Sequence, residues 1–384
     1  MQTLLIKNAH VYAPEDLGLC DVLCAGDRII DVGTEVWPVG EPTVHQAEGR
    51  PLIPGLIDTH IHVMGASGGG GPQTRSHDMP LSWITLAGIT TIVSPLGTDS
   101  LSRTIPALLS RAAALTYEGV NAFVYTGGWR NPIPTLTGDP QTDLAYIDRI
   151  LGIKVAISEQ GSPPFSVDDL CHLAQAAVVG GGIAGKKAIL HAHIGDRPEG
   201  LNPLRQAVEE SGIRPDRFVA THVNRNPRLW AQALEFAKAG GSIDLTSQIQ
   251  KDRGYGNAIE PDRALLELFD SDIPHEHVTI STDAGGAYQL PGSSRRSGYA
   301  MAEPMTLFEL ITKVVKTGIA WPDILPLVTR NAADRPGLIG KGRIRDGGDA
   351  DFVLLNEEME IDCVWSRGRL MVSDGDAVVR SDYE

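Results

Sequence analysis

Eight short runs of apolar and β-branched residues, separated mostly by helical patterns, constrain the fold of this chain more than any other feature. Each run has the length of a buried strand, and such an alternation is typical of a parallel sheet flanked by helices. Eight repeats predict an α/β fold, a (β/α)8 barrel of the TIM type. The structural alternative is a doubly wound sheet, but the first unit lacks its Gly-rich phosphate-binding turn. The expected strands are 55–62, 90–97, 122–128, 152–158, 187–194, 217–223, 241–247 and 278–284.

Helix start and stop signals lie between most of these runs. The pattern over 101–119 has Ser100 and Ser102 as candidate N-caps and Gly119 as its end. A later helix is expected to begin at the serine and aspartates of 166–169, and another to begin at Pro227 and to end in two glycines.

The two ends of the chain resemble each other and differ from the middle. Residues 1–54 and 343–384 have period-2 apolar spacing broken by Gly, Asp and Asn, which is typical of hairpins. We therefore expect both ends to build one small β-sandwich domain. Residues 55–342 would form the barrel domain, which suits a chain of 384 residues.

Composition excludes several functional classes. A net charge of −15 opposes binding to nucleic acids and to anionic membranes. No run approaches the ~18 apolar residues of a membrane helix, and the N-terminus lacks the apolar core of a signal peptide. Cys20 and Cys24 are spaced like metal ligands, but no second pair follows, so we expect packing thiols in a reducing compartment. The expectation is a cytoplasmic protein that acts on a small molecule and binds neither nucleic acid nor membrane.

Six residues that can bind metal lie near the carboxyl ends of five expected strands. His60 and His62 are two positions apart, so their side chains would project to the same face of a strand. The active sites of such barrels gather at this end, and an isolated charge in an apolar run would be costly. The other four candidates are Lys154, His193, His222 and Asp283.

This set of residue types suits two divalent metal ions. Imidazoles and a carboxylate favour Zn²⁺ or a similar ion. A lysine ammonium is a poor ligand, but reaction with CO₂ would make Lys154 an anionic bridge; the alternative is a salt bridge between Lys154 and Asp283. Metals would lower the pKa of a bridging water towards ~7 and polarise a carbonyl. Asp283 could then take the proton of the water and deliver it to a leaving amine.

The remaining histidines are weaker candidates. His191 would share a face with His193, so it either supports a ligand or is a core histidine. Six others are expected to be structural or solvated: His10, His45, His77, His172, His275 and His277.

At these residues the chain resembles the amidohydrolase superfamily, and within it the isoaspartyl (β-aspartyl) dipeptidase family. The likeness covers nearly the whole chain and includes PGLIDTHIH, LAGITTIVSPLGTDSLSR, IDRILGIKVAIS, THVNRN, QALEFAKAGGSIDLTS and GDADFVLL. The resemblance implies a binuclear zinc site with carbamylated Lys154, amide hydrolysis by a metal-bridging hydroxide, and a large homo-oligomer. It also implies that the six residues named above are the metal ligands.

Four positions depart from the substrate pocket of that family. Gly69 stands where the family has a glutamate for the free amine of the substrate, and Trp129 stands where it has a tyrosine that assists at the scissile carbonyl. Gly161 replaces an arginine for a carboxylate, and Ala287 replaces a serine. Two pocket residues are kept, Arg225 and Thr98. Arg225 can hold one carboxylate through two parallel hydrogen bonds.

The departures suggest a substrate other than a β-aspartyl dipeptide. A buried ammonium without its carboxylate costs several kcal/mol, so we expect one carboxylate near the scissile bond and no free α-amine. An N-acyl amino acid or a cyclic amide would fit. Trp129 could donate through its indole N–H or stack on a flat substrate.

Other readings of the pocket remain open. Substitute residues could restore the lost contacts and keep β-aspartyl dipeptides as substrates: Glu159 or Asp78 for the amine, and Arg130, Arg295 or Arg296 for the carboxylate. A lactonase or a deaminase could use the same metal site, and a metal-binding relic would have no activity. Residues 284–304 form either a lid or a surface connection, and the glycines of 65–71 either bind an anion or make a turn.

Overall fold

The computed structural model describes residues 3–38, 40–66, 70–293 and 298–384, and within them the eight expected strands form one parallel sheet. The strands follow chain order from β6 to β13. Their bounds are β6 Leu56–Asp58, β7 Ile89–Ser94, β8 Asn121–Gly127, β9 Ile150–Ile157, β10 Ile189–Ile194, β11 Phe218–Thr221, β12 Ser242–Thr246 and β13 Val278–Ser281.

The first and last strands of this sheet meet just beyond their carboxyl ends. The Asp283 N–H donates to the His60 carbonyl at 2.9 Å, and the His62 N–H donates to the Ala284 carbonyl at 2.7 Å. The backbone and the hydroxyl of Thr282 both donate to the buried carboxylate of Asp58. These bonds make the barrel nearly closed, so the (β/α)8 prediction is confirmed.

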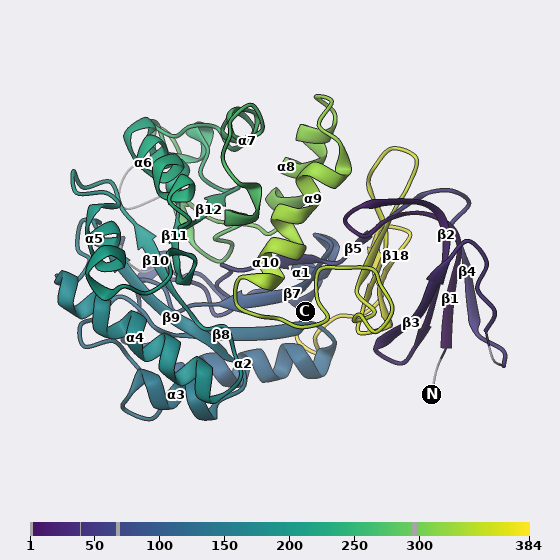
Figure 1. Ribbon diagram of the computed structural model, residues 1–384, viewed down its shortest axis with the longest axis horizontal. Helices are drawn as coiled ribbons and strands as arrows, with labels where there is room; N and C mark the ends of the chain where they lie inside the picture. Colours follow the sequence, from purple (N-terminus) through teal and green to yellow (C-terminus); the bar gives the residue numbers. More distant parts are fainter. Residues whose placement is uncertain (1–2, 39, 67–69, 294–297) are drawn as a thin grey trace.

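Helices cover the outside of the barrel (Figure 1). They are α1 Leu81–Leu86, α2 Ile105–Glu118, α3 Pro140–Tyr146, α4 Val167–Ile183, α5 Asn202–Ser211, α6 Pro227–Lys238, α7 Pro261–Phe269, α8 Thr306–Val315, α9 Trp321–Val328 and α10 Arg330–Asp334. Helix α2 ends at Gly119 as expected, but its N-cap is Thr104 and not Ser100 or Ser102. Pro106 sits in the first turn of α2 and suits a helix start at Ile105. Helix α4 begins with the expected cap, a reciprocal pair of hydrogen bonds between Ser166 and Asp169.

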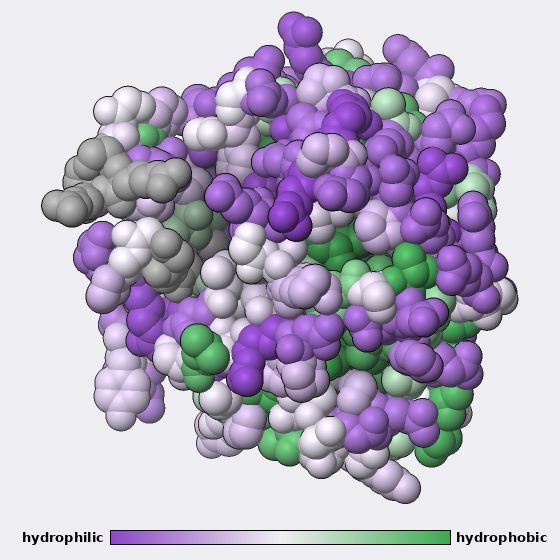
Figure 2. All heavy atoms as spheres, turned by 90° about the vertical axis from the view of Figure 1, so that its left-hand side faces the viewer, coloured by the Kyte–Doolittle hydropathy of each residue, from purple (hydrophilic) through white to green (hydrophobic). Residues whose placement is uncertain are grey.

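The helical side of the molecule is mainly polar. Figure 2 shows hydrophilic side chains over most of this face, with apolar ones between them in its central and lower part. No helix in the described part of the chain is long and apolar enough to cross a membrane.

Both chain ends contribute to one further sheet, which lies at the end of the molecule away from helices α4, α5 and α6 (Figure 1). Among the described residues it has nine strands in the order β19-β18-β17-β16-β5-β1-β2-β3, with β4 paired to β1. The strands are β1 Thr3–Tyr12, β2 Asp16–Ala25, β3 Arg28–Gly33, β4 Thr43–Gln46, β5 Pro51–Pro54, β16 Phe352–Leu355, β17 Ile361–Ser366, β18 Arg369–Ser373 and β19 Asp376–Ala377. Strand β16 of the C-terminal end pairs with β5 of the N-terminal end, so the two ends complete each other.

This sheet has a hydrophobic core of its own and also packs on the barrel. Along β16, Phe352 and Leu354 belong to the small core, whereas Val353 and Leu355 belong to the barrel core. Such alternation follows from the period of two in a strand. Among the described residues, the buried members of the small core lie within 4–52 and 344–365. It supports the division into domains 1–54 with 343–384 and 55–342, which stays a prediction.

The segment after β13 is more regular than a long loop. Strands β14 Ala287–Gln289 and β15 Tyr299–Met301 pair as an antiparallel hairpin, and residues 294–297 between them lie outside the described residues.

Candidate metal centre

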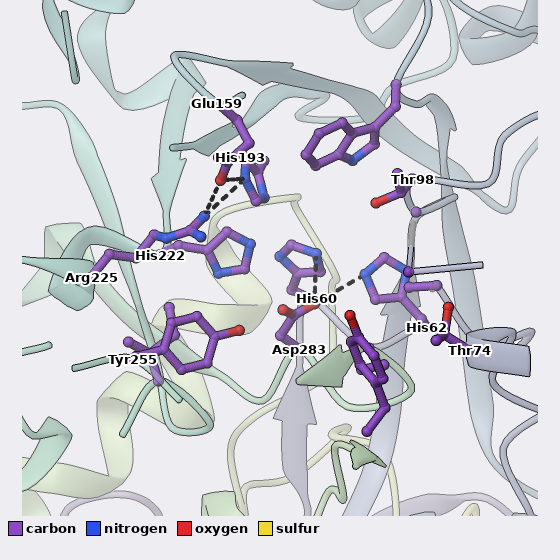
Figure 3. A pocket seen from close by; sticks show the side chains of 18 of the residues that line it. His60, His62, Thr74, Thr98, Glu159, His193, His222, Arg225, Tyr255 and Asp283 are labelled. Atoms are coloured by element: carbon purple, nitrogen blue, oxygen red, sulfur yellow. Dashed lines mark hydrogen bonds and ion pairs between the residues drawn. The ribbon is translucent and has the colours of Figure 1, made fainter. Parts of the chain in front are cut away.

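A cavity of about 520 Å³ opens at the carboxyl ends of the barrel strands. The structure brings all six predicted metal ligands to its lining, as Figure 3 shows for five of them by label. They are His60, His62, Lys154, His193, His222 and Asp283.

Four of these residues follow their strands instead of lying within them. Strand β6 ends at Asp58, β11 at Thr221 and β13 at Ser281, several residues before the ends expected from the sequence. His222 and Asp283 have φ values of 68° and 58°, in the left-handed region. A non-glycine residue there costs roughly 1–2 kcal/mol, and such residues concentrate at functional sites. This backbone conformation ends the strand and leaves the side chain at the cavity.

Hydrogen bonds determine which ring nitrogen of His62 and His222 could bind a metal ion. Nδ1 of His62 lies 3.0 Å from the carbonyl oxygen of Pro95, and Nδ1 of His222 lies 2.8 Å from Oγ1 of Thr246. In both residues Nε2 is then the nitrogen that could bind a metal ion. Metal-binding histidines are usually oriented in this way, by a hydrogen bond from their other ring nitrogen.

His60 lies at the centre of the group. Its Nε2 is 3.2 Å from Nζ of Lys154 and 3.6 Å from Oδ1 of Asp283, while Nε2 of His62 is 3.1 Å from the same carboxylate oxygen. The ligand atoms of His60, His62 and Asp283 lie within 4.8 Å of one another, close enough to hold one ion. The rings of His193 and His222 form a second group, with centroids 4.5 Å apart.

His193 is oriented differently from the other three histidines. Its Nε2 lies 3.3 Å from Oε2 of Glu159 and 3.1 Å from Nη1 of Arg225, so Nδ1 is the nitrogen left for a ligand. The same Oε2 of Glu159 accepts a hydrogen bond from Arg225 Nη1 at 2.7 Å, and Oε1 accepts one from the Gln160 N–H at 2.8 Å. Glu159 therefore contacts both a candidate ligand, His193, and Arg225.

Burial favours the protonation states that metal binding needs. It lowers the pKa values of His60, His193 and His222 well below the usual range, so these imidazoles are neutral. Burial also lowers the pKa of Lys154 to about 7, against the opposing effects of Asp283 and Asp244. Burial alone would raise the pKa of Asp283, but His222, His62 and Lys154 outweigh it and hold the pKa below its usual value.

The structure does not show the alternative role of Lys154, which was to form a salt bridge with Asp283. In the described part of the chain Lys154 forms no ion pair, and its side-chain nitrogen contacts His60. A salt bridge from Lys154 to Asp283, the alternative to a bridging carbamate, is therefore absent from that part of the chain.

The predicted substrate residues are placed unequally. Arg225, Trp129 and Thr98 line the cavity, with the Trp129 ring edge-on to His193 at 4.8 Å and Thr98 exposed. Gly69 lies outside the described residues, as do Arg295 and Arg296. Ala287 lines the cavity, whereas the exposed residues Gly161, Asp78 and Arg130 are not in its lining. Of the substitutes considered for the lost contacts, only Glu159 is described in the lining.

Sequence reasoning missed two tyrosines that line the cavity. Tyr255 lies in the segment after β12, and Tyr299 begins β15. No motif marks either of them; their positions after barrel strands were the only signal available.

A buried layer lies beneath the candidate ligands. Nε2 of His191 is 3.3 Å from Nδ1 of His60, and its ring stacks on Tyr125 at 4.9 Å. Asp244 accepts hydrogen bonds from three hydroxyl groups, those of Thr221, Thr279 and Ser281. His191 thus contacts a candidate ligand, as the first of its two expected roles requires.

Comparisons with known proteins agree with the fold. No family model matches the chain. The crystal structure of β-aspartyl dipeptidase from Fervidobacterium islandicum AW-1, in complex with a β-Asp-Leu dipeptide, is 34% identical and has a TM-score of 0.91, with 100% of both chains covered. Dihydropyrimidinase from Brevibacillus agri NCHU1002 shares the fold, with 17% identity, a TM-score of 0.70 and coverage of 98% of this chain and 96% of that chain.

A curated relative is more distant. Adenine deaminase of Deinococcus radiodurans is 26% identical over 373 residues, which is 92% of this chain, but the chain spans only 59% of the length of that protein. The full-length match at 34% identity confirms the resemblance seen in the motifs. On that match, the chain belongs to the β-aspartyl dipeptidase family of metal-dependent amidohydrolases.

Proposed function

We propose that the chain hydrolyses an amide bond in a small substrate that carries a carboxylate, with two divalent metal ions, expected to be Zn²⁺. One observation carries the proposal: four imidazoles, a buried lysine and a carboxylate converge on one cavity. The donor set fits zinc, which binds neutral imidazole nitrogens. Burial keeps His60 neutral, and His62, His193 and His222 each use one ring nitrogen in a hydrogen bond and can offer the other to a metal ion. His60, His62 and Asp283 would hold one ion, and His193 and His222 the other.

Lys154 would complete the site as a carbamate. Its amine would form a bond to the carbon of CO₂ and release one proton, which gives an anionic group with two oxygens. The short distance to His60 and the lack of an ion pair in the described part of the chain support this proposal. A carboxylate-like group suits a place between two cations better than an ammonium does.

Each remaining residue has a part in the reaction. The metal ions would acidify a water molecule and polarise the substrate carbonyl. Asp283 would accept the proton of the attacking water and pass it to the leaving amine. Arg225 would bind the substrate carboxylate, while Glu159 holds the guanidinium and His193 in position.

The cavity favours a substrate without a free ammonium next to the scissile bond. Among the described lining residues the carboxylates are Glu159 and Asp283. Glu159 is already bonded to Arg225, to His193 and to the Gln160 N–H, and Asp283 faces the histidines. A buried ammonium would therefore lack a partner in this part of the lining. An N-acylated or cyclic amide with one carboxylate fits best.

Metal content tests the enzyme class. We expect two tightly bound divalent ions in each chain, loss of amide hydrolysis on chelation, and recovery with added Zn²⁺. Inductively coupled plasma mass spectrometry and an amidase assay measure both. Less than one tightly bound ion in a chain would contradict the proposal, and would favour a relic if no hydrolysis occurs.

A matched pair of substrates tests the pocket. β-Asp-Leu, the dipeptide bound in the Fervidobacterium enzyme, and N-acetyl-β-Asp-Leu differ only at the α-amine. Removing an unpaired ammonium is expected to raise kcat/KM by about tenfold, equivalent to about 1.4 kcal/mol. A larger kcat/KM for the free dipeptide would reject this substrate class and point to β-aspartyl dipeptides. A lactone and adenine in the same assay test the two other hydrolytic reactions.

Two further proposals concern the setting of the enzyme. The four cysteines are all free, which supports a reducing, cytoplasmic location. We also propose a homo-oligomer, on the basis of the family resemblance, with size-exclusion chromatography and light scattering as its test.

A further inference from the structure

One wall of the cavity is the segment between β12 and α7, in which Ile249 and Tyr255 both face the cavity. The buried side-chain amide of Asn224 donates to the carbonyls of Thr246, Ile249 and Ile259, and the Ile259 N–H donates back to the Asn224 carbonyl at 3.0 Å. The segment is thus attached at both ends to one residue.

That attachment couples this wall of the cavity to the candidate metal centre. Asn224 lies between His222 and Arg225 in the turn after β11. The segment that carries Tyr255 is therefore held by the same turn that carries a candidate metal ligand and the carboxylate-binding arginine. The Tyr255 N–H also bonds to the Gln250 carbonyl, and the Ala258 N–H bonds to the Tyr255 carbonyl. A side chain on such a segment has a defined place relative to the reacting atoms.

The ring of Tyr255 is held by a neighbour, and its hydroxyl is not. The guanidinium carbon of Arg225 lies 5.8 Å from the ring centroid, a cation–π contact. Figure 3 shows the Tyr255 hydroxyl pointing into the cavity towards Asp283. Among the described residues it has no hydrogen-bond partner. Burial, only partly offset by Arg225, raises the pKa of Tyr255 to about 12, so the phenol keeps its proton at neutral pH.

The other donors of the described lining are placed differently, and the Trp129 ring lies edge-on to His193. Arg225 is bonded to Glu159 and serves the substrate carboxylate, and Thr98 is exposed. The hydroxyl of Tyr299 lies against the segment from Gly70, where it would be only 2.6 Å from a Cβ built on that glycine. Tyr255 is therefore the neutral donor that Figure 3 places facing Asp283.

We propose that Tyr255 donates a hydrogen bond to the oxygen of the scissile carbonyl and stabilises the charge that develops there. The proposal rests on the amide hydrolysis proposed above. When the water oxygen bonds to the carbonyl carbon, the π electron pair moves to the carbonyl oxygen, and the phenol donates to that oxygen. Tyr255 itself keeps its proton, which acts only through the hydrogen bond. Such a donor is worth more in the transition state than in the ground state.

The test compares Tyr255→Phe with Tyr299→Phe, two variants that each remove one phenol oxygen from the same cavity. On whichever of β-Asp-Leu and N-acetyl-β-Asp-Leu the wild type cleaves, we expect Tyr255→Phe to lower kcat by about 10²–10³-fold, with KM within about threefold. Tyr299→Phe should lower kcat by less than about tenfold. Phenylalanine keeps the ring beneath Arg225, so metal content and thermal stability should match the wild type.

A second readout does not depend on turnover. A phosphinate analogue, with a tetrahedral phosphorus in place of the scissile carbon, should bind Tyr255→Phe more weakly by about the factor lost in kcat. Calorimetry measures its Kd, and free leucine should bind equally to wild type and variant. A kcat within about threefold of wild type, a rise in KM alone, or unchanged phosphinate affinity would each overturn the role of Tyr255. A wild type that cleaves no amide would overturn the proposed function, and phosphinate binding would still decide on Tyr255.

Discussion

Replacing Asp283 with asparagine is expected to lower kcat by about 10⁴-fold, because general acid–base catalysis contributes roughly 10²–10⁴ and an amide cannot accept the proton of the water. Oδ1 of Asp283 lies 3.1 Å from His62 Nε2 and 3.6 Å from His60 Nε2. Asparagine keeps the shape and one oxygen donor at this position, so most of the metal should remain bound. The pKa of Asp283 is below its usual value, so the wild-type group is a carboxylate, able to act as a base at neutral pH.

Steady-state kinetics with metal analysis on the same samples check this prediction. Asp78→Asn is the matched control, because Asp78 is exposed and is not in the described lining. Its activity should stay within about threefold of wild type. Near-full activity of Asp283→Asn with both ions bound would reject Asp283 as the base, whereas loss of the metal in that variant would show that its main role is as a ligand.

The convergence of the candidate ligands on one cavity could be predicted because barrel topology brings residues that are distant in the sequence close together in space. His60 and Asp283 are more than two hundred residues apart, yet both come after barrel strands, and the carboxyl ends of all eight strands share one rim. Their side chains are therefore neighbours, 3.6 Å apart at their closest polar atoms. The alternation of strands and helices was enough to predict the fold and this rim.

The ends of the strands could not be predicted as closely. The apolar residues that flank His60, His222 and Asp283 extend the strand pattern through them, but the ladder stops earlier. His222 and Asp283 adopt left-handed backbone, which tertiary contacts impose against the local preference of the residue. The period-2 pattern of apolar residues carries no information about such a backbone conformation.

The contacts between side chains within the cavity could not be predicted from the sequence either. Glu159 appeared only as a substitute partner for an amine, whereas its carboxylate is bonded to Arg225 and to His193. Those contacts depend on how three separate strand ends meet and on the rotamer of each side chain. Tyr255 has no motif around it, and only its place in the cavity identifies it.

Replacing Lys154 with methionine is expected to remove most of the bound metal and nearly all activity. Methionine keeps the volume of the buried side chain, so the barrel core should still pack, but it has no amine to react with CO₂. The two imidazole groups would then lack the bridge between them, and bound metal should fall below one ion in each chain. We expect kcat to fall by roughly 10³-fold, since metals supply several kcal/mol of transition-state stabilisation and each 1.36 kcal/mol is tenfold.

Labelled bicarbonate separates the carbamate from a simple lysine ligand. Wild type grown with ¹³C-bicarbonate should show a carbamate carbon by NMR, and Lys154→Met should not. Short carboxylic acids, which can occupy the space left by the carbamate, should restore part of the metal and of the activity. Lys187→Met is the control, because Lys187 pairs with Asp216 at 3.4 Å and is not in the described lining of the cavity. If Lys154→Met retained two ions and kept its activity within about tenfold, Lys154 would not be the bridge, since the loss of a shared ligand must weaken both groups together.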